Sequence, residues 1–194
     1  MSWSASAGAT SYILQEARDG GFSTASNVYV GPATSVPMSG KSPTRYYYRV
    51  KARNAAGDSG WSNVQQVDVL WELEPNDIKN QANGSLLSGL TYCGKLSSGT
   101  TIGDTDDFYF DAPSAGTAQL TLTLPPALVG HTAIWVYSQS DLFSHLCGTG
   151  PVNGSSYSAS CPLATAGRYY INLYAAGNQF YDDVNPYSVR VTYP

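Results

Sequence analysis

Hydrophobic and polar residues alternate along residues 45–52, and this period of two predicts a half-buried antiparallel β-strand. One face of that strand carries Tyr46, Tyr48, Val50 and Ala52, and the other face carries Tyr47, Arg49 and Lys51. Strand-like runs also occur at 11–16, 27–30 and 62–69, and Gly and Pro residues mark turns between them. The first part of the chain therefore predicts a small domain of short antiparallel strands.

Seven further runs of strand-forming residues follow, separated by Gly, Pro, Ser and Asn. They lie at 91–96, 107–111, 118–124, 133–137, 155–161, 168–174 and 187–193. Alternation is clearest in two of these runs. One face of the run 118–124 carries Leu120, Leu122 and Leu124, and one face of the run 187–193 carries Tyr187, Val189, Val191 and Tyr193. Short strands separated by turn signals in this way predict a second β-sandwich.

The length and composition of the chain agree with this pattern. A chain of 194 residues can form one large core or two small ones, and the change of pattern near residue 70 favours two domains, 1–69 and 70–194. Charged residues make up 12% of the chain and there are 15 tyrosines, a composition that favours strands over helices.

The charge of the chain limits its partners. A net charge of −4 and a pI near 4.9 argue against nucleic acid or an anionic membrane, because both require a basic patch. No apolar run approaches the roughly 20 residues of a membrane span. The start at Met1, Ser2 and Trp3 also lacks the basic and apolar segments of a signal peptide. We therefore expect no nucleic acid and no membrane as partner.

Acidic residues gather in two segments at and after the junction between the predicted domains. The first segment holds Glu72, Glu74, Asn76 and Asp77, and the second holds Asp104, Asp106 and Asp107. Carboxylate and amide oxygens on turn-prone backbone are the ligands that calcium prefers. The simpler alternatives are a solvated acidic turn, or a cap that Asn76 or Asp77 provides for a short helical turn.

The chain contains three cysteines. Cys147 and Cys161 bracket a loop rich in Gly, Ser and Asn, and a disulfide that closes a loop of this size stabilises a protein by about 3 kcal/mol. We expect this disulfide and, with it, a secreted protein, while two buried thiols are the alternative. Cys93 lies in a strand-like run and is expected to be a small buried residue.

The sequence offers little for catalysis. His131 and His145 are the only histidines, and neither belongs to a His-Glu-x-x-His motif or accompanies a Gly-x-Ser-x-Gly motif. The cysteines form no Cys-x-x-Cys pair of the kind that indicates zinc. A Ser-His-Asp arrangement made across loops is an alternative, but we expect that the chain is not an enzyme.

The first domain resembles a fibronectin type III domain. The resemblance covers residues 2–69, and the residues that carry it are Trp3, 9–12, the alternating strand 45–52 and the segment 53–62. It implies a β-sandwich in which Trp3 belongs to strand B and Tyr46 is the tyrosine-corner residue. Strand A and the beginning of strand B have no counterpart, so the resemblance implies an N-terminally truncated sandwich with an exposed edge.

The second domain resembles the bacterial pre-peptidase C-terminal domain, a jelly-roll-like module related to the collagen-binding domains of clostridial collagenases. The segments that carry the resemblance are 74–77, 94–96, 104–110, 166–171 and 186–189. In calcium-binding members of that family, the ligands come from the acidic residues before the proline, from the Asn-Asp pair after it, and from two aspartates three positions apart in the next acidic turn. The resemblance therefore implies a calcium site formed by Glu72, Glu74, Asn76, Asp77, Asp104 and Asp107, in which Asp106 can replace one of its neighbours. Tyr187 is a candidate for a supporting hydroxyl, and the alternative is a core residue, as tyrosines of a terminal strand usually are.

Aromatic residues suggest a surface for binding. Trp135 and Tyr137 alternate with Ile134 and Val136, and Tyr170 follows a tyrosine on the opposite face of its strand. A row of exposed rings is suited to a fibrous polypeptide or a polysaccharide, because rings give a large contact area at low entropic cost. In a two-layer sandwich, however, such aromatic side chains often belong to the core.

These features together predict an all-β chain of two β-sandwiches in tandem, the first fibronectin type III-like and the second jelly-roll-like. We expect a calcium-binding accessory region of a secreted bacterial peptidase or other hydrolase. It would hold an insoluble protein substrate such as collagen, or assist export and maturation, beside the catalytic domain of a parent enzyme. The alternative is a structural or adhesive spacer tandem of a surface protein, with polysaccharide as a ligand.

Overall fold

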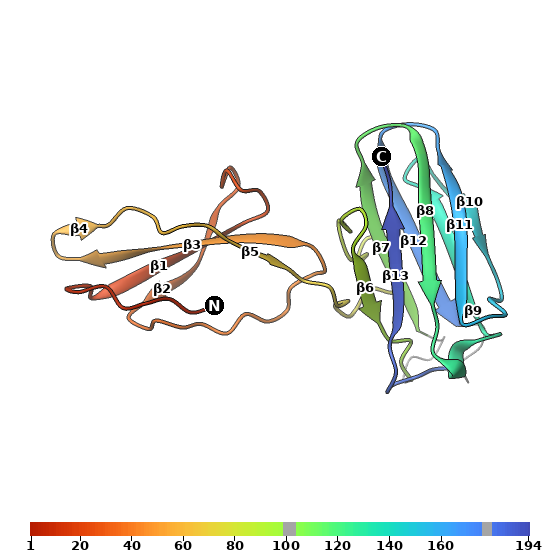
Figure 1. The fold of residues 1–194 in the computed structure, drawn as a ribbon, viewed down its shortest axis with the longest axis horizontal. Coiled ribbons are helices and arrows are strands. Elements are labelled where there is room, and N and C mark those ends of the chain that lie inside the picture. The colour runs from red at the N-terminus through yellow and green to blue at the C-terminus, as the bar shows by residue number, and fades with distance from the viewer. Residues whose placement is uncertain (99–103, 176–179) are drawn as a thin grey trace. The chain divides into compact units, whose positions relative to one another are not determined.

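The structure is a computed structural model that describes residues 1–98, 104–175 and 180–194. These residues form two compact units, one of Met1–Lys41 with Arg45–Val69 and the other of Ser42–Thr44 with Leu70–Pro194. All pairs of strands labelled in Figure 1 are antiparallel, so the predicted all-β class is confirmed. In the part of the chain that the structure describes, no helix is long and apolar enough to cross a membrane.

The first unit contains one sheet. Its strands are β1 (Ser11–Ala17), β2 (Ser26–Gly31), β3 (Arg45–Asn54), β4 (Gly57–Asp58) and β5 (Gln65–Asp68). β1 lies between β2 and β3, and β3 also pairs with β4 and β5. The sequence pattern predicts all of these strands except β4, whose two residues are too few to show a period.

The core of the first unit lies on one face of this sheet. Leu14, Tyr46 and Tyr48 are buried there, and Trp3 is among the half-buried residues that pack against them. The second layer is short among the described residues: Ser2 pairs with Ser35 in an isolated bridge. Beside this layer an open groove of about 440 Å³ is lined in part by Trp3, Leu14 and Tyr48. The sheet is therefore covered only in part.

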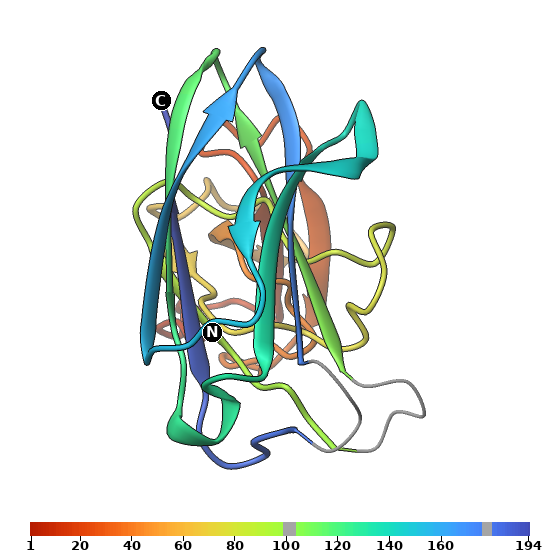
Figure 2. The same cartoon turned by 90° about the vertical axis from the view of Figure 1, so that its right-hand side faces the viewer.

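The described residues of the second unit form a sandwich of two four-stranded sheets. The strands are β6 (Thr91–Gly94), β7 (Thr105–Ala112), β8 (Gly116–Thr123), β9 (Thr132–Ser138), β10 (Asp141–Thr149), β11 (Ser156–Leu163), β12 (Gly167–Ala175) and β13 (Tyr187–Thr192). One sheet has the order β10-β9-β12-β7, and the other has the order β11-β8-β13-β6 (Figures 1 and 2). A short 3₁₀ helix, η1 (Pro126–Leu128), connects β8 with β9.

Alternate residues of both sheets form the core between them. The largest of these residues, all less than 2% exposed, include Phe108, Phe110, Leu120, Leu122, Ile134 and Tyr187. Side chains on a strand point alternately to the two faces of a sheet, so the alternation read from the sequence places Leu120, Leu122, Val189 and Val191 inside, as the structure does. The core of the second unit therefore follows directly from the period of two.

Strand β10 is absent from the sequence prediction, so the described residues of the sandwich form eight strands where the pattern predicts seven. The pairing of β10 with β9 is irregular on both sides of His145. Residues 142–144 bulge outward, and Phe143 is 97% exposed. A bulged edge strand has no strict period of two, which explains why the sequence pattern does not predict β10.

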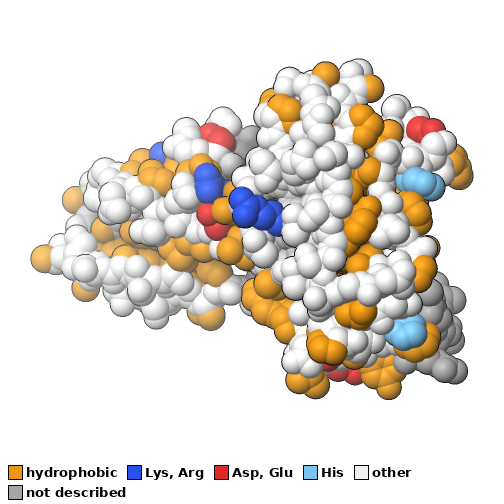
Figure 3. All heavy atoms as spheres, turned by 45° about the vertical axis from the view of Figure 1, so that its right-hand side comes forward, with side chains coloured by type: hydrophobic (Ala, Val, Ile, Leu, Met, Phe, Trp, Pro, Cys, Tyr) orange, Lys and Arg blue, Asp and Glu red, His pale blue; other side chains and the backbone are white. Residues whose placement is uncertain are grey.

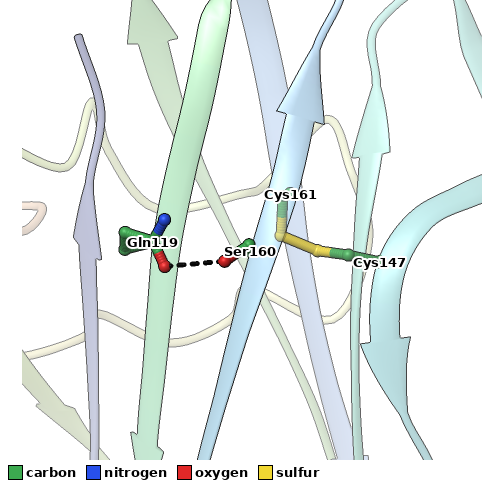
Figure 4. The surroundings of a disulfide bond; sticks show 4 residues. All are labelled: Gln119, Cys147, Ser160 and Cys161. Carbon is green, nitrogen blue, oxygen red and sulfur yellow. Dashed lines mark hydrogen bonds between the residues drawn. A yellow bond between two sulfur atoms is a disulfide. The ribbon is translucent and has the colours of Figure 1, made fainter.

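A disulfide joins Cys147 on β10 to Cys161 on β11, with the two Cα atoms 5.2 Å apart (Figure 4). These strands are edges of different sheets, so the bond ties the two layers together along one side of the sandwich. Beside it the Ser160 hydroxyl donates to Gln119 Oε1 at 2.9 Å. Cys93, on β6, is not part of a disulfide.

Candidate functional site

The acidic junction begins beside β6, where Trp71 and Cys93 form an isolated parallel bridge. Cys93 N–H donates to the Leu70 carbonyl at 2.8 Å, and Glu72 N–H donates to the Cys93 carbonyl at 3.0 Å. These bonds carry the chain along β6 and turn the Glu72 side chain toward Gly94. A Cβ atom on Gly94 would overlap the Glu72 carboxylate and the Tyr187 hydroxyl. Glycine at position 94 therefore leaves the space that the Glu72 carboxylate occupies.

Three carboxylates converge at this place. Glu72, Glu74 and Asp106 each offer an oxygen, and these oxygens all lie within 4.8 Å of one another. The hydroxyl of Tyr187, a fully buried residue, lies 2.8 Å from Glu72 Oε2 and 2.5 Å from Asp106 Oδ2. A phenol has a single hydrogen, so it satisfies one carboxylate at a time. The second contact then remains a close approach of two oxygens unless a proton or a cation intervenes.

Asn76 completes the group from the turn of the junction. Its side chain is fully buried, and one atom of its amide head lies 3.0 Å from Asp106 Oδ1 and 3.1 Å from Glu74 Oε2. As nitrogen this atom donates a hydrogen bond to each carboxylate. As oxygen it would be a further ligand atom for a cation held by the same two carboxylates. Both orientations keep Asn76 inside the cluster.

Asp104 and Asp77 lie at the side of the cluster. Asp104 is 7% exposed, and its Oδ2 accepts a hydrogen bond from Ser97 N–H at 2.5 Å. Its carboxyl group also interacts with that of Asp77, which raises the pKa of Asp104 in addition to the effect of burial. Five of the six residues in the predicted ligand set thus lie in or beside one cluster.

Asp107, the sixth predicted ligand, faces the other side of β7. Its Oδ1 accepts hydrogen bonds from Lys79 Nζ at 2.6 Å and from Asn172 Nδ2 at 3.0 Å. Asp106, rather than Asp107, points into the carboxylate cluster. The sequence contains the signal for this: Phe108 and Phe110 face the core, and a period of two then places Asp106, rather than Asp107, on the same side.

Burial and mutual repulsion raise the proton affinity of the cluster. Burial, followed by the charges of Asp104 and Glu72, raises the pKa of Glu74 to about 7. Burial is also the main cause that raises the pKa of Glu72, and it raises that of Asp106 well above its ordinary value. A raised pKa means that these carboxyl groups take up protons more readily than free ones, and a bound cation would take the place of such protons. The cluster is therefore suited to bind a cation in competition with protons.

A second feature lies on the outer face of the sheet β10-β9-β12-β7. The aromatic residues that point outward are half-buried: Tyr109 on β7, Trp135 and Tyr137 on β9, and Tyr170 and Tyr174 on β12. Tyr170 stands opposite Tyr137 on one side and Tyr109 on the other, so the rings form a band across neighbouring strands. We call these five residues the aromatic band.

The sequence pattern places Trp135 and Tyr137 on the face opposite Ile134 and Val136, and it leaves open which of the two faces is the outer one. Ile134, Val136 and Tyr169 are buried, whereas Trp135 and Tyr137 are half-buried, as alternation requires. The sequence does not predict the cations beside the band. Lys79 Nζ lies 5.0 Å from the centre of the Tyr137 ring, and the Arg168 guanidinium carbon lies 3.8 Å from the centre of the Tyr109 ring.

Both histidines pack against aromatic rings. The ring centre of His131 lies 3.4 Å from that of Phe180, and the ring centre of His145 lies 4.1 Å from that of Trp135. Figure 3 shows pale blue histidine side chains next to hydrophobic side chains on the second unit. His145 therefore extends the aromatic band at its β10 side.

No protein-family model matches the chain. The chain is similar to the pre-peptidase C-terminal domain of a collagenase from Bacillus anthracis, at 23% identity over 54% of this chain and 90% of that one, with a TM-score of 0.43. It is also similar to the K3 cleaved adhesin domain of Lys-gingipain from Porphyromonas gingivalis, at 13% identity over 57% of this chain and 80% of that one, with a TM-score of 0.34.

A third similarity spans both units. It is to the FN1-FN3 domains of chicken CNTN1, at 16% identity over 95% of this chain and 54% of that one, with a TM-score of 0.25. Each of these similarities is too distant to assign a role to a residue of this chain.

Proposed function

We propose that the second unit is a non-catalytic binding module that holds an insoluble protein such as collagen on its aromatic band and binds calcium at the carboxylate cluster. It would act as an accessory region of a secreted bacterial peptidase or other hydrolase. The observation that carries the proposal is the aromatic band, a row of half-buried rings on the outer face of a sheet, away from the core. The disulfide supports secretion, because such bonds persist in oxidising compartments.

The aromatic band offers suitable chemistry for a fibrous protein. Rings with few rotatable bonds give a large contact area at low entropic cost. Arg168 and Lys79 lie over two of the rings. Arg168 pairs with Asp111 and Lys79 with Asp107, and these ion pairs use only some of their N–H groups, so the others would be donors for the carbonyl groups of an extended backbone. A sheet gives these groups a rigid support, which lowers the ordering cost of binding.

The carboxylate cluster supports calcium rather than a softer metal. Its atoms are carboxylate and amide oxygens, the ligands of hard cations, and calcium accepts six to eight of them in flexible geometry at about 2.3–2.6 Å. Glu72, Glu74, Asn76 and Asp106 would hold the ion, with Asp104 and Asp77 beside them. We assign Asp106 in place of Asp107, whose carboxylate pairs with Lys79. The ion would neutralise buried negative charge and fix the junction against β7.

Retention on insoluble matrices tests the binding role. The chain is incubated with insoluble collagen, elastin and chitin, and the Trp135→Ala, Tyr137→Ala double variant is compared with Trp61→Ala. Trp61 is a matched control, because it is a half-buried tryptophan of the first unit that also has cations against its ring. We expect retention on a protein matrix, a loss of roughly 30-fold or more in the double variant, since two aromatic anchors contribute about 2 kcal/mol or more, and no loss in the control.

Other outcomes would contradict the proposal. Retention on chitin alone would favour the polysaccharide alternative, and retention on no matrix would favour a spacer. Equal loss in Trp61→Ala would show that binding does not depend on the aromatic band.

Thermal unfolding in excess EDTA and in millimolar calcium tests the metal site separately. A ligand at about 100 times its dissociation constant stabilises the folded state by about 2.7 kcal/mol. We expect calcium to raise the unfolding temperature, and the Glu74→Gln, Asp106→Asn double variant to abolish this rise. Asp111→Asn is the control, because Asp111 is an exposed acid on the same strand that pairs with Arg168. Superimposed scans with and without calcium would refute the site.

A further inference from the structure

The sequence contains two Asn-Gly pairs, Asn83-Gly84 and Asn153-Gly154. An Asn side chain followed by Gly is the arrangement in which the backbone nitrogen of the next residue approaches the side-chain amide most freely, because glycine has no Cβ to block it. The two pairs have opposite environments in the fold, so their chemistry is expected to differ.

Asn83 is buried, and both its side chain and its backbone are hydrogen-bonded. It is 3% exposed, its Oδ1 accepts a hydrogen bond from Leu73 N–H at 2.6 Å, and its Nδ2 donates to the Leu73 carbonyl at 2.9 Å. Its own N–H donates to the Asp107 carbonyl, and its carbonyl accepts from Tyr109 N–H, both at 2.8 Å. These four bonds restrain both the side chain and the backbone of Asn83, so its side-chain carbon cannot move toward the nitrogen of Gly84 unless they break.

Asn153 lies in the loop between β10 and β11 and is exposed, as is Gly154. Within residues 1–98, 104–175 and 180–194, neither the Asn153 amide nor the Gly154 N–H has a hydrogen-bond partner. The chain is fixed only on either side: Val152 N–H donates to the Thr132 carbonyl at 2.8 Å, and the Ser155 carbonyl accepts from Leu124 N–H at 2.9 Å. In the described part of the chain, no hydrogen bond therefore fixes the two residues between these anchors.

We infer that Asn153-Gly154 is a site of spontaneous deamidation in the folded protein, and that Asn83-Gly84 is protected. In the first step the Gly154 backbone nitrogen attacks Asn153 Cγ and loses its proton, a C–N bond forms, and the side-chain nitrogen leaves as ammonia. Water then adds to one of the two carbonyl groups of the resulting succinimide and opens the ring to aspartate or isoaspartate. The reaction needs only water, and it changes the net charge from −4 to −5, since a neutral amide becomes one carboxylate.

Peptide mapping of the intact chain tests the inference. The folded protein is kept in mildly alkaline buffer, samples are taken over time, and trypsin then releases peptides 80–95 and 96–168, which follow from lysines 79 and 95 and Arg168. Asn153 is the only asparagine in the second peptide, so its deamidation is read directly from the mass of that peptide. Fragmentation locates any change in the first peptide at Asn83 or Asn80.

We expect Asn153 to deamidate more than about tenfold faster than Asn83 in the folded chain, because reaction at Asn83 requires local opening of the sandwich. In concentrated urea the two rates should become similar. Gly154→Ala should slow the reaction at Asn153 without harm to the fold, because the added Cβ would lie 3.6 Å from the nearest atom, Ser156 O. Equal rates at Asn153 and Asn83 in the folded chain, or an unchanged rate in Gly154→Ala, would overturn the inference.

Discussion

The disulfide between Cys147 and Cys161 gives the sharpest prediction for stability. It closes a loop with a sequence separation of 14 residues. In the chain-entropy model a loop of this size stabilises the folded state by about 3 kcal/mol, because the bond restricts the unfolded chain. Replacing both cysteines with alanine removes this restriction. Because Cys161 is 1% exposed, water cannot fill the space that its sulfur atom leaves.

The expected loss is large for one domain. A unit of this size loses roughly 3–5 °C of unfolding temperature for each kcal/mol, so the double alanine variant should unfold about 9–15 °C lower. The transition of the first unit should not move, since the bond lies wholly in the second unit. Reduction of the unaltered chain should lower the temperature by a similar amount, which separates loss of the cross-link from loss of side-chain volume.

Thermal and urea unfolding, followed by tyrosine and tryptophan fluorescence, measure this effect in oxidised, reduced and variant proteins. Cys93→Ala is the matched control, because Cys93 lies on β6 and forms no disulfide. A loss below about 1 kcal/mol on reduction would refute the reasoning from loop closure. An equal loss in the Cys93 variant would attribute the effect to cysteine packing rather than to the bond.

Three further predictions concern the carboxylate cluster and its surroundings. Gly94→Ala should abolish the rise in unfolding temperature that calcium causes, because its Cβ would overlap the Tyr187 hydroxyl; an unchanged calcium response in thermal scans would contradict this. Lys79→Met should destabilise the second unit by about 3 kcal/mol, because it leaves the carboxylate of Asp107, which is 1% exposed, without its cation. Urea midpoints measure this loss, and Lys79→Arg should show a smaller one. In EDTA the second unit should lose stability as pH rises from about 5 to about 8. The pKa of Glu74 is about 7 in the folded chain and 4.5 as the ordinary value, so the folded state binds more protons than the unfolded state in this interval. Unfolding temperatures that rise with pH would contradict this sign.

Regular strands of this fold can be predicted from sequence, and irregular ones cannot. β3, β8 and β13 show a period of two because one of their faces is buried, and the burial of Tyr46, Leu122 and Val189 follows from it. β10 shows no such period, since its pairing with β9 is broken at His145. Its place in the sheet depends on long-range contacts and on the disulfide.

Part of the candidate site can likewise be predicted from the sequence, and part cannot. Local composition is enough to find the acidic junction and to bring Glu72, Glu74 and Asn76 together, because they lie within one short turn. The choice between Asp106 and Asp107 requires the orientation of β7, which the neighbouring phenylalanines reveal only when strand periodicity is applied to them. The cation that pairs with Asp107 comes from a segment 28 positions away, and no local pattern predicts that contact.

The irregular course of β10 also bears on how copies of the chain behave toward one another. A straight edge strand presents a regular row of free backbone groups, which invites pairing with the edge of another molecule. The breaks in pairing on both sides of His145 interrupt that row. A bulge also bends the strand that carries it, so residues 142–144 present no straight edge. The same irregularity that hides this strand from sequence reading thus protects one side of the sandwich against edge-to-edge aggregation.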